Sequence, residues 1–577
     1  MRELTLRLLR SVSLIALLAA GATAALADGG AGPYLAGRVA SIHADYKAAA
    51  AYFTQALVSD PTNAELQENA LLAQLAIGAF DKGQPMAEAL ERGGVKSPIA
   101  DMAILATKVR TGDFQGVIAA LDAGKSSGPL VDGFLRAWSV LGNGQMSDAL
   151  AAFDGLVKQP QIKSLALYNK ALALASVGDF EGADKLLSGA EAGPINATRR
   201  SVVAHAQVLS QLERDKDALE LIDKIFGADT TDPVIAPLRA DLAAGKSVPF
   251  DLIRSPIDGL AEVYFAVASA LGNDLRPGDI SSEIDVLLFA RTALHLRPDL
   301  SEAALVAADM LERQEQHELA IEVYQGIDPA SPDHLAAELG RSEALLAEGK
   351  TDAAIEVLQQ LSRAAPDRIA IWASLGDVLR RNERFSEGAE AYDRALALVE
   401  GDARDFWGLY YARGICQERL DKWDAAEADF RKALDLSPDQ PSVLNYLGYS
   451  LLEKKVKLDE ALAMIERAAK ARPDDGAISD SLGWAFYRLG RYADAEAEME
   501  RAIHLMPVDP VVNDHLGDVY WAVGRKREAE FQWKRALSFK PDTEDEAKRI
   551  RRKLEVGLDL VLKEEGSDPL AVTKNGN

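Results

Sequence analysis

The sequence predicts an all-α fold, a solenoid of antiparallel helix pairs stacked along the chain. One pattern is written five times between residues 367 and 541, and its clearest copy runs from Ser481 to Ala495. The copies close on prolines spaced by 34, 34, 72, 35, 34 and 34 residues, at Pro298, Pro332, Pro366, Pro438, Pro473, Pro507 and Pro541. No convincing strand pattern is present. Such a period indicates units that each need a neighbour to bury an apolar face.

The spacing of apolar residues in the clearest copy predicts two helices. Residues of the first helix recur at i, i+4 and i+7, and those of the second do the same, so each set shares one helix face. The first set is Leu482, Phe486 and Leu489, and the second is Ala495, Met499 and Ala502. Gly483 and Ala495 are small, so the two backbones can approach closely. Gly490 and Pro507 end the helices, because glycine accepts the left-handed conformation and proline cannot continue a helix.

A 34-residue period with small and aromatic residues at these offsets resembles the tetratricopeptide repeat, a helix-turn-helix unit. The resemblance covers most of residues 28–541. It implies a right-handed superhelical solenoid of roughly 13 repeats. It also implies that the first helices line a concave face that binds other proteins or peptides.

The N-terminus predicts a signal peptide over residues 1–27. Arginines precede an apolar run from Val12 to Ala20 that is too short to span a bilayer, and Ala25-Leu26-Ala27 forms a small-residue cleavage site. We expect cleavage between Ala27 and Asp28; the alternative, a first repeat helix, lacks amphipathic spacing. A bacterial lipid anchor requires cysteine after the signal, so Asp28 predicts no N-terminal lipid anchor. No later stretch predicts an integral membrane segment in the mature chain.

The remaining chain predicts four parts. Residues 28–230 read as degenerate repeats that keep the turn and the second helix, and residues 263–541 as the regular array. Between them, prolines crowd residues 231–262 and predict a joint, with one short helix. Residues 542–577 predict an amphipathic capping helix over 544–565 and a frayed tail. We expect the basic residues of this helix on a solvated outer face, with contact to an acidic partner as the alternative; they are Lys548, Arg549, Arg551, Arg552 and Lys553.

Composition and motifs disfavour catalysis. The net charge of −25 becomes −27 when the three arginines and one glutamate of residues 1–27 are removed, and such a surface repels nucleic acid and anionic lipid. The seven histidines lack metal-site spacing, and three Gly-Lys-Ser/Thr tails lack the glycine that a phosphate loop requires. The single cysteine, Cys416, fits a small buried hydrophobe. We expect no enzyme, no cofactor and no metal.

The candidate site is the concave face of the regular array. Carried over by offset from the repeat family, it comprises Arg380, Tyr411, Asn445, Tyr449, Asp480, Trp484, Tyr487, Arg488, Asp514, Asp518 and Trp521. An aromatic track flanked by aspartates would be formed by Tyr449, Trp484, Tyr487 and Trp521. Aromatic side chains of this kind anchor bound peptides. For Trp484 and Trp521, packing between adjacent repeats is an equal alternative. The lysine and asparagine clamp with which some relatives grip a C-terminal carboxylate is absent.

The whole chain resembles long tetratricopeptide proteins of the Gram-negative envelope, and more narrowly adaptors of periplasmic C-terminal processing proteases that trim cell-wall hydrolases. The narrower resemblance rests on overall length, the central break and residues 442–541. It implies a periplasmic scaffold, soluble or peripherally associated with the envelope, that delivers substrates. The alternative is a structural brace in an envelope assembly or secretion complex.

Overall fold

The computed structural model describes residues 31–190, 192–276, 279–400 and 403–566. Every regular element within these residues is helical, which confirms the predicted all-α class. The predicted signal peptide, its cleavage site at Ala27 and Asp28, and nearly all of the predicted tail lie outside the described residues. The chain divides into two compact units, Met1–Val357 and Leu358–Asn577.

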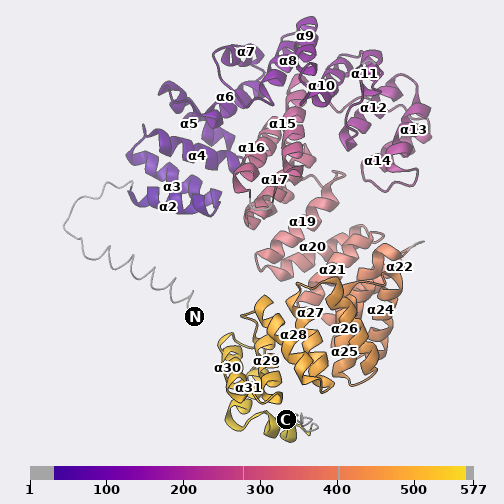
Figure 1. The fold of residues 1–577 in the computed structure, drawn as a ribbon. Coiled ribbons are helices and arrows are strands. Elements are labelled where there is room, and N and C mark those ends of the chain that lie inside the picture. Colours follow the sequence, from indigo (N-terminus) through magenta and orange to yellow (C-terminus); the bar gives the residue numbers. More distant parts are fainter. Residues whose placement is uncertain (1–30, 191, 277–278, 401–402, 567–577) are drawn as a thin grey trace, which may run out of the picture. The chain divides into compact units, whose positions relative to one another are not determined.

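The first unit is a succession of antiparallel helices (Figure 1). Its helices are α2 (Ala31–Ile42), α3 (Tyr46–Ser59), α4 (Ala64–Ala76), α5 (Phe80–Arg92), α6 (Pro98–Arg110), α7 (Phe114–Asp122), α8 (Asp132–Gly142), α9 (Met146–Val157), α10 (Lys163–Ser176), α11 (Phe180–Leu187), α12 (Arg199–Gln211), α13 (Asp215–Phe226), α14 (Ile235–Ala243), α15 (Pro256–Asn273), α16 (Ile280–Leu296), α17 (Ser301–Arg313), α18 (His317–Gln325) and α19 (His334–Ala347). Helix α20 (Thr351–Ala364) spans the division between the units.

The long helix α15 packs inside the first unit against α6, α8 and α10 (Figure 1). Gly259 permits the close approach to α8, because a Cβ there would lie 2.5 Å from the Trp138 ring. The Tyr264 hydroxyl donates to Ser127 Oγ at 2.9 Å. Helix α16 similarly packs against α4 and α6. Within the first unit, the later helices α15 and α16 therefore cover one side of the earlier helices α4, α6, α8 and α10.

The predicted joint at residues 231–262 lies within the first unit. It holds the short helix α14, a non-helical stretch and the start of α15. Ile235 before this stretch, Ile253 in it and Leu260 after it belong to one hydrophobic core. The division between compact units falls about a hundred residues later, at Val357 and Leu358, and the role of residues 231–262 as a joint between two segments stays a prediction.

The second unit contains the clearest repeats as helix pairs. Its elements are α21 (Ile369–Arg381), α22 (Phe385–Ala397), the 3-10 turn η1 (Arg404–Phe406), α23 (Trp407–Arg419), α24 (Trp423–Leu436), α25 (Pro441–Glu453), α26 (Leu458–Ala471), α27 (Gly476–Arg488), α28 (Tyr492–Leu505), α29 (Pro510–Ala522), α30 (Lys526–Ser538), α31 (Glu544–Val556) and α32 (Leu558–Glu564). In the pair α27 and α28 a Cβ on Gly483 would lie 2.8 Å from Met499 Cγ, which confirms the need for a small residue. Gly490 has a φ of +74°, as its position after α27 predicts.

The predicted single capping helix is wrong in one respect: the structure has two helices. Gly557 separates α31 from α32 with a φ of +81°. A Cβ on Gly557 would lie 2.6 Å from the Trp521 ring, so the turn is fitted against α29. The apolar spacing alone could not reveal this break, because it continues through Gly557.

Candidate functional site

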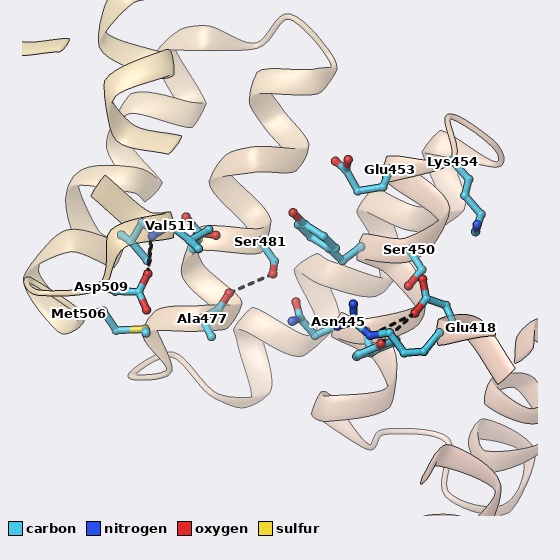
Figure 2. A pocket seen from close by; sticks show the side chains of 15 residues that line it. Glu418, Asn445, Ser450, Glu453, Lys454, Ala477, Ser481, Met506, Asp509 and Val511 are labelled. Carbon is cyan, nitrogen blue, oxygen red and sulfur yellow. Dashed lines mark hydrogen bonds and ion pairs between the residues drawn. The ribbon is translucent and has the colours of Figure 1, made fainter. Parts of the chain in front are cut away.

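A cavity of about 430 Å³ lies in the second unit, on the side formed by the first helices of successive repeats (Figure 2). Helices α23, α25 and α27 and the start of α29 supply its walls. It is lined by Glu418, Arg419, Asn445, Tyr446, Tyr449, Ser450, Glu453, Lys454, Ala477, Asp480, Ser481, Met506, Asp509, Val511 and Val512. We call this cavity the repeat groove.

One wall of the repeat groove is polar and contains an unpaired acceptor. Asn445 Oδ1 is buried and has no hydrogen-bond partner among the described residues. Buried acceptors are normally satisfied, so this atom leaves hydrogen-bonding capacity unused in the wall of the repeat groove. Tyr449 lies one helical turn further along α25, and burial raises the pKa of its hydroxyl, which keeps it a donor.

The reason for the unpaired acceptor is visible along the repeats. Asp480 and Asp514 occupy the position of Asn445, three residues before the glycine of their first helices. Asp480 forms a hydrogen bond with His515 Nδ1 at 3.0 Å, and Asp514 accepts one from Lys553 Nζ at 2.8 Å. The residue equivalent to His515 beside Asn445 is Ser481, whose short side chain donates to the Ala477 carbonyl at 3.0 Å instead (Figure 2). The repeat groove is therefore open where Ser481 replaces a larger partner.

The opposite wall is apolar. Met506, Val511 and Val512 belong to the turn after α28 and the first turn of α29. Asp509 caps α29 by accepting from the Val511 and Val512 amides at 2.9 and 3.0 Å, which fixes both valines (Figure 2). The repeat groove thus offers hydrogen-bonding groups on one side and an apolar surface on the other.

Carboxylates at the edge of the repeat groove are tied to neighbouring side chains. Glu453 accepts from Trp484 Nε1 at 2.8 Å and pairs with Arg488 Nη1 at 3.0 Å. The His515 ring, paired with Asp480, stacks on Trp484 with centroids 4.0 Å apart. Burial lowers the pKa of His515, but the Asp480 carboxylate outweighs this, so the pKa lies above its usual value. The pair with Asp480 therefore favours the protonated form of His515.

Of the eleven predicted site residues, the structure brings Asn445, Tyr449 and Asp480 together in the repeat groove. Arg488 adjoins it through Glu453. Trp484 and Tyr487 are 8% and 7% exposed, and their rings stack at 4.7 Å. This burial favours the packing alternative for Trp484.

Two further predicted residues lie outside the repeat groove. Arg380 Nε donates to the Tyr392 hydroxyl at 3.3 Å within its own repeat. Tyr411 packs edge-on against Tyr446 with ring centroids 5.9 Å apart. Whether either contacts a partner stays a prediction.

The last three predicted residues are covered by the C-terminal helices of the chain itself. Lys553 Nζ reaches Asp514 and Asp518 at 2.8 and 2.7 Å, and its side chain is fully buried. Trp521 Nε1 donates to Asp559 at 3.0 Å. The expected solvated outer face is therefore wrong for Lys553, because α31 turns this residue into the array. Asp514, Asp518 and Trp521 are engaged within the chain.

Sequence reasoning missed the apolar wall of the repeat groove. Met506, Val511 and Val512 stand at the turn between repeats, whereas the prediction carried over only positions within first helices. The available sequence signal was Val508, an apolar residue directly after the closing proline, at the turn beside this wall. An apolar residue at a solvated turn indicates a contact surface when others surround it.

Metal ligands and reactive thiols can be assessed for the described residues. These residues contain no group of three or more His, Cys, Asp or Glu side chains that could hold a metal ion. Cys416 is fully buried, as predicted, and burial raises the pKa of its thiol to about 11, which disfavours the reactive thiolate. Among these residues no helix is both long and apolar enough to cross a bilayer.

A family model described as tetratricopeptide repeat matches residues 134–196, 288–334, 339–403, 374–441 and 454–510. A tetratricopeptide repeat-containing protein from Pseudomonas aeruginosa is 28% identical over 188 residues. That match covers 32% of this chain and spans 31% of the length of the relative.

Three solved structures are similar over large shares of their own chains. The APC/C hetero-tetramer Cut9-Hcn1 is 14% identical, with 92% of this chain and 97% of that chain covered and a TM-score of 0.38. A tetratricopeptide repeat protein from Parabacteroides merdae is 17% identical, with 45% and 98% covered and a TM-score of 0.37. YrrB, described as a TPR protein with an unusual peptide-binding site, is 18% identical, with 33% and 94% covered and a TM-score of 0.27.

Proposed function

We propose that the chain, whose repeats match the tetratricopeptide repeat family model in four stretches, is a scaffold that captures an extended segment of another protein in the repeat groove. The observation that carries this proposal is the buried, unpaired Oδ1 of Asn445 beside an open cavity. A backbone N–H of an extended segment would supply the missing donor. The Tyr449 hydroxyl is placed to bond the same segment.

The shape of the repeat groove favours a segment with an apolar side chain. Met506, Val511 and Val512 form one wall, and Val511 is 38% exposed, so capture would remove apolar area from water. The walls belong to packed helices and a capped turn rather than to a long loop. Preorganised walls reduce the entropy lost on binding.

We extend the proposal to location and purpose. The predicted signal peptide supports export to the periplasm, and the resemblance of residues 442–541 to protease adaptors supports delivery of captured proteins to a C-terminal processing protease. The captured proteins would be enzymes that remodel the cell wall. Sequencing the N-terminus of the chain purified from a Gram-negative producing cell tests export: a start at Asp28 supports it, and a start at Met1 contradicts it.

Affinity capture of proteins from a periplasmic extract tests the groove. The full mature chain carries Asn445→Leu, which removes the acceptor, or Ser481→His, which fills the opening with the residue that the next repeat already uses. Both variants should lose the captured proteins, while Phe531→Ala, at an exposed residue of α30 that does not line the repeat groove, should retain them. Undiminished capture by both groove variants would overturn the assignment. Recovery of one stable envelope complex without a protease would replace delivery by a bracing role.

A further inference from the structure

Helix α2, the first helix of the first unit, packs one face against α3 (Figure 1). Gly37 and Ala40 on this face are buried, and Ala40 belongs to the same hydrophobic cluster as Phe53 of α3. A Cβ on Gly37 would lie 2.8 Å from Phe53 Cε1, so the two helices are in close contact there. This contact fixes which side of α2 faces away from α3.

The opposite face of α2 is apolar and exposed. Three large aliphatic side chains recur on it at i, i+4 and i+7, so they form one row along the helix. They are Leu35, Val39 and Ile42, which are 63%, 57% and 75% exposed. We call them the α2 row. Single exposed apolar residues are ordinary, but a continuous row of them indicates a contact surface.

The C-terminal cap shows how this chain builds an end helix that faces water. Every exposed side chain of α31 is charged; these are Glu544, Asp545, Glu546, Lys548, Arg551 and Glu555. Solenoids need end repeats with a polar outer face to stay soluble. Helix α2 departs from this rule, which favours a partner that covers the α2 row.

The charges beside the α2 row suit a second copy of the same chain. Arg38, within the row, pairs with Glu65 of α4 at 3.2 Å, and their side chains are 50% and 58% exposed. A twofold axis brings a surface against its own copy, so each chain would present both a positive and a negative side chain to the other. The rim of this surface is therefore electrostatically complementary to itself.

The rest of α2 and α3 lacks the negative charge that keeps copies of this chain apart. Residues 31–59 contain one acidic residue, Asp45, and two basic residues, Arg38 and Lys47, in a chain of net charge −25 with 89 acidic residues. Like charge repels two copies over an acidic surface, but not over this one. An anionic membrane surface is a weaker fit, because membrane-bound helices carry several basic residues beside the apolar face and α2 has only Arg38.

We propose that the α2 row is a dimerisation surface, on which α2 of one chain packs antiparallel against α2 of a second copy around a twofold axis. Val39 is the middle residue of the row, so it lies nearest the axis and contacts Val39 of the second copy. Cleavage at Asp28 would leave three residues before α2, which span at most about 10 Å and are too short to fold back over the row. One pair of helix faces is a small interface, so the dimer should dissociate in the micromolar range.

Analytical ultracentrifugation of the full mature chain at increasing concentration tests the proposal. We expect the mass to rise from that of one chain to that of two. Val39→Glu should raise the dissociation constant at least about tenfold, because it places two like charges at the axis. Val177→Glu, at a valine directly after α10 that is 56% exposed, is the matched control and should dimerise as the wild type does. A chain that stays monomeric, or a dimer that Val39→Glu does not weaken, would overturn the proposal.

A charge swap identifies the second copy as the occupant of the α2 row. Chains with Val39→Glu and chains with Val39→Lys should each be monomeric alone and should form mixed dimers when combined, because opposite charges then meet at the axis. Absence of mixed dimers would overturn the twofold packing. A mature chain that stays monomeric but floats with phosphatidylcholine vesicles would assign the α2 row to a membrane surface and would also overturn the proposal. The repeat groove belongs to the second unit, so these outcomes are independent of the capture experiments.

Discussion

Replacing Asn445 by leucine should stabilise the second unit while it destroys capture. The buried Oδ1 of Asn445 has no partner, and a buried unpaired acceptor costs about 1–3 kcal/mol. Because the residue is only half-buried, the lower end applies, and the change should gain about 1 kcal/mol. For a unit of this size that raises the melting temperature by about 2–4 °C.

The assay is differential scanning calorimetry of the full mature chain, followed by affinity capture with the same preparation. Asn169→Leu is the matched control in the first unit. Asn169 is fully buried, its Oδ1 accepts from Trp138 Nε1 at 2.9 Å, and its Nδ2 donates to the Leu165 carbonyl at 3.0 Å. The same substitution at Asn169 should destabilise the chain by about 1–3 kcal/mol, because it leaves the buried indole N–H of Trp138 without an acceptor. A fall in stability for Asn445→Leu similar to that of Asn169→Leu would refute the reasoning that Asn445 is unpaired.

Three further predictions concern the second unit. The pKa of His515 lies above its usual 6.5. The stabilisation from its pair with Asp480 is therefore complete below pH 6.5 and is lost as the pH rises through the pKa of His515 in the folded chain. Thermal melts should show this fall in stability in the wild type and not in His515→Gln. Lys553→Met leaves Asp514 and Asp518 without their buried cation and should cost about 3–5 kcal/mol, seen as faster hydrogen exchange in α31; unchanged exchange would mean the pair contributes nothing. Gly517→Ala should lower the melting temperature more than Gly483→Ala, because its new Cβ meets the rigid Trp533 ring rather than the flexible Met499, and equal losses would contradict this packing account.

The repeat pattern predicted the helix pairs and the glycines that let them pack, because those features depend on contacts within about 34 residues. Gly483 against Met499 is an example. The same offsets selected Asn445 and Tyr449, which line the repeat groove, since neighbouring first helices keep equivalent positions side by side.

Contacts beyond the nearest repeat could not be predicted in this way. The Tyr46 hydroxyl donates to Gln314 Oε1 at 2.6 Å across 268 residues, and no periodicity reports that α15 to α17 pack inside the first unit. The burial of Trp484 depends on His515 in the next repeat, and that of Asp518 on Lys553 in the cap. Offsets within a repeat say which face a residue occupies, but not whether another part of the chain already covers it.

Photo-crosslinking tests the central claim, capture in the repeat groove, most directly. A photoreactive phenylalanine replaces Val511 on the apolar wall in one full-length variant and the exposed Phe531 of α30 in another. Irradiation in a periplasmic extract should crosslink a partner protein at position 511 and not at position 531. Crosslinks at 531 alone, with none at 511, would show that proteins dock on another surface and would contradict the account.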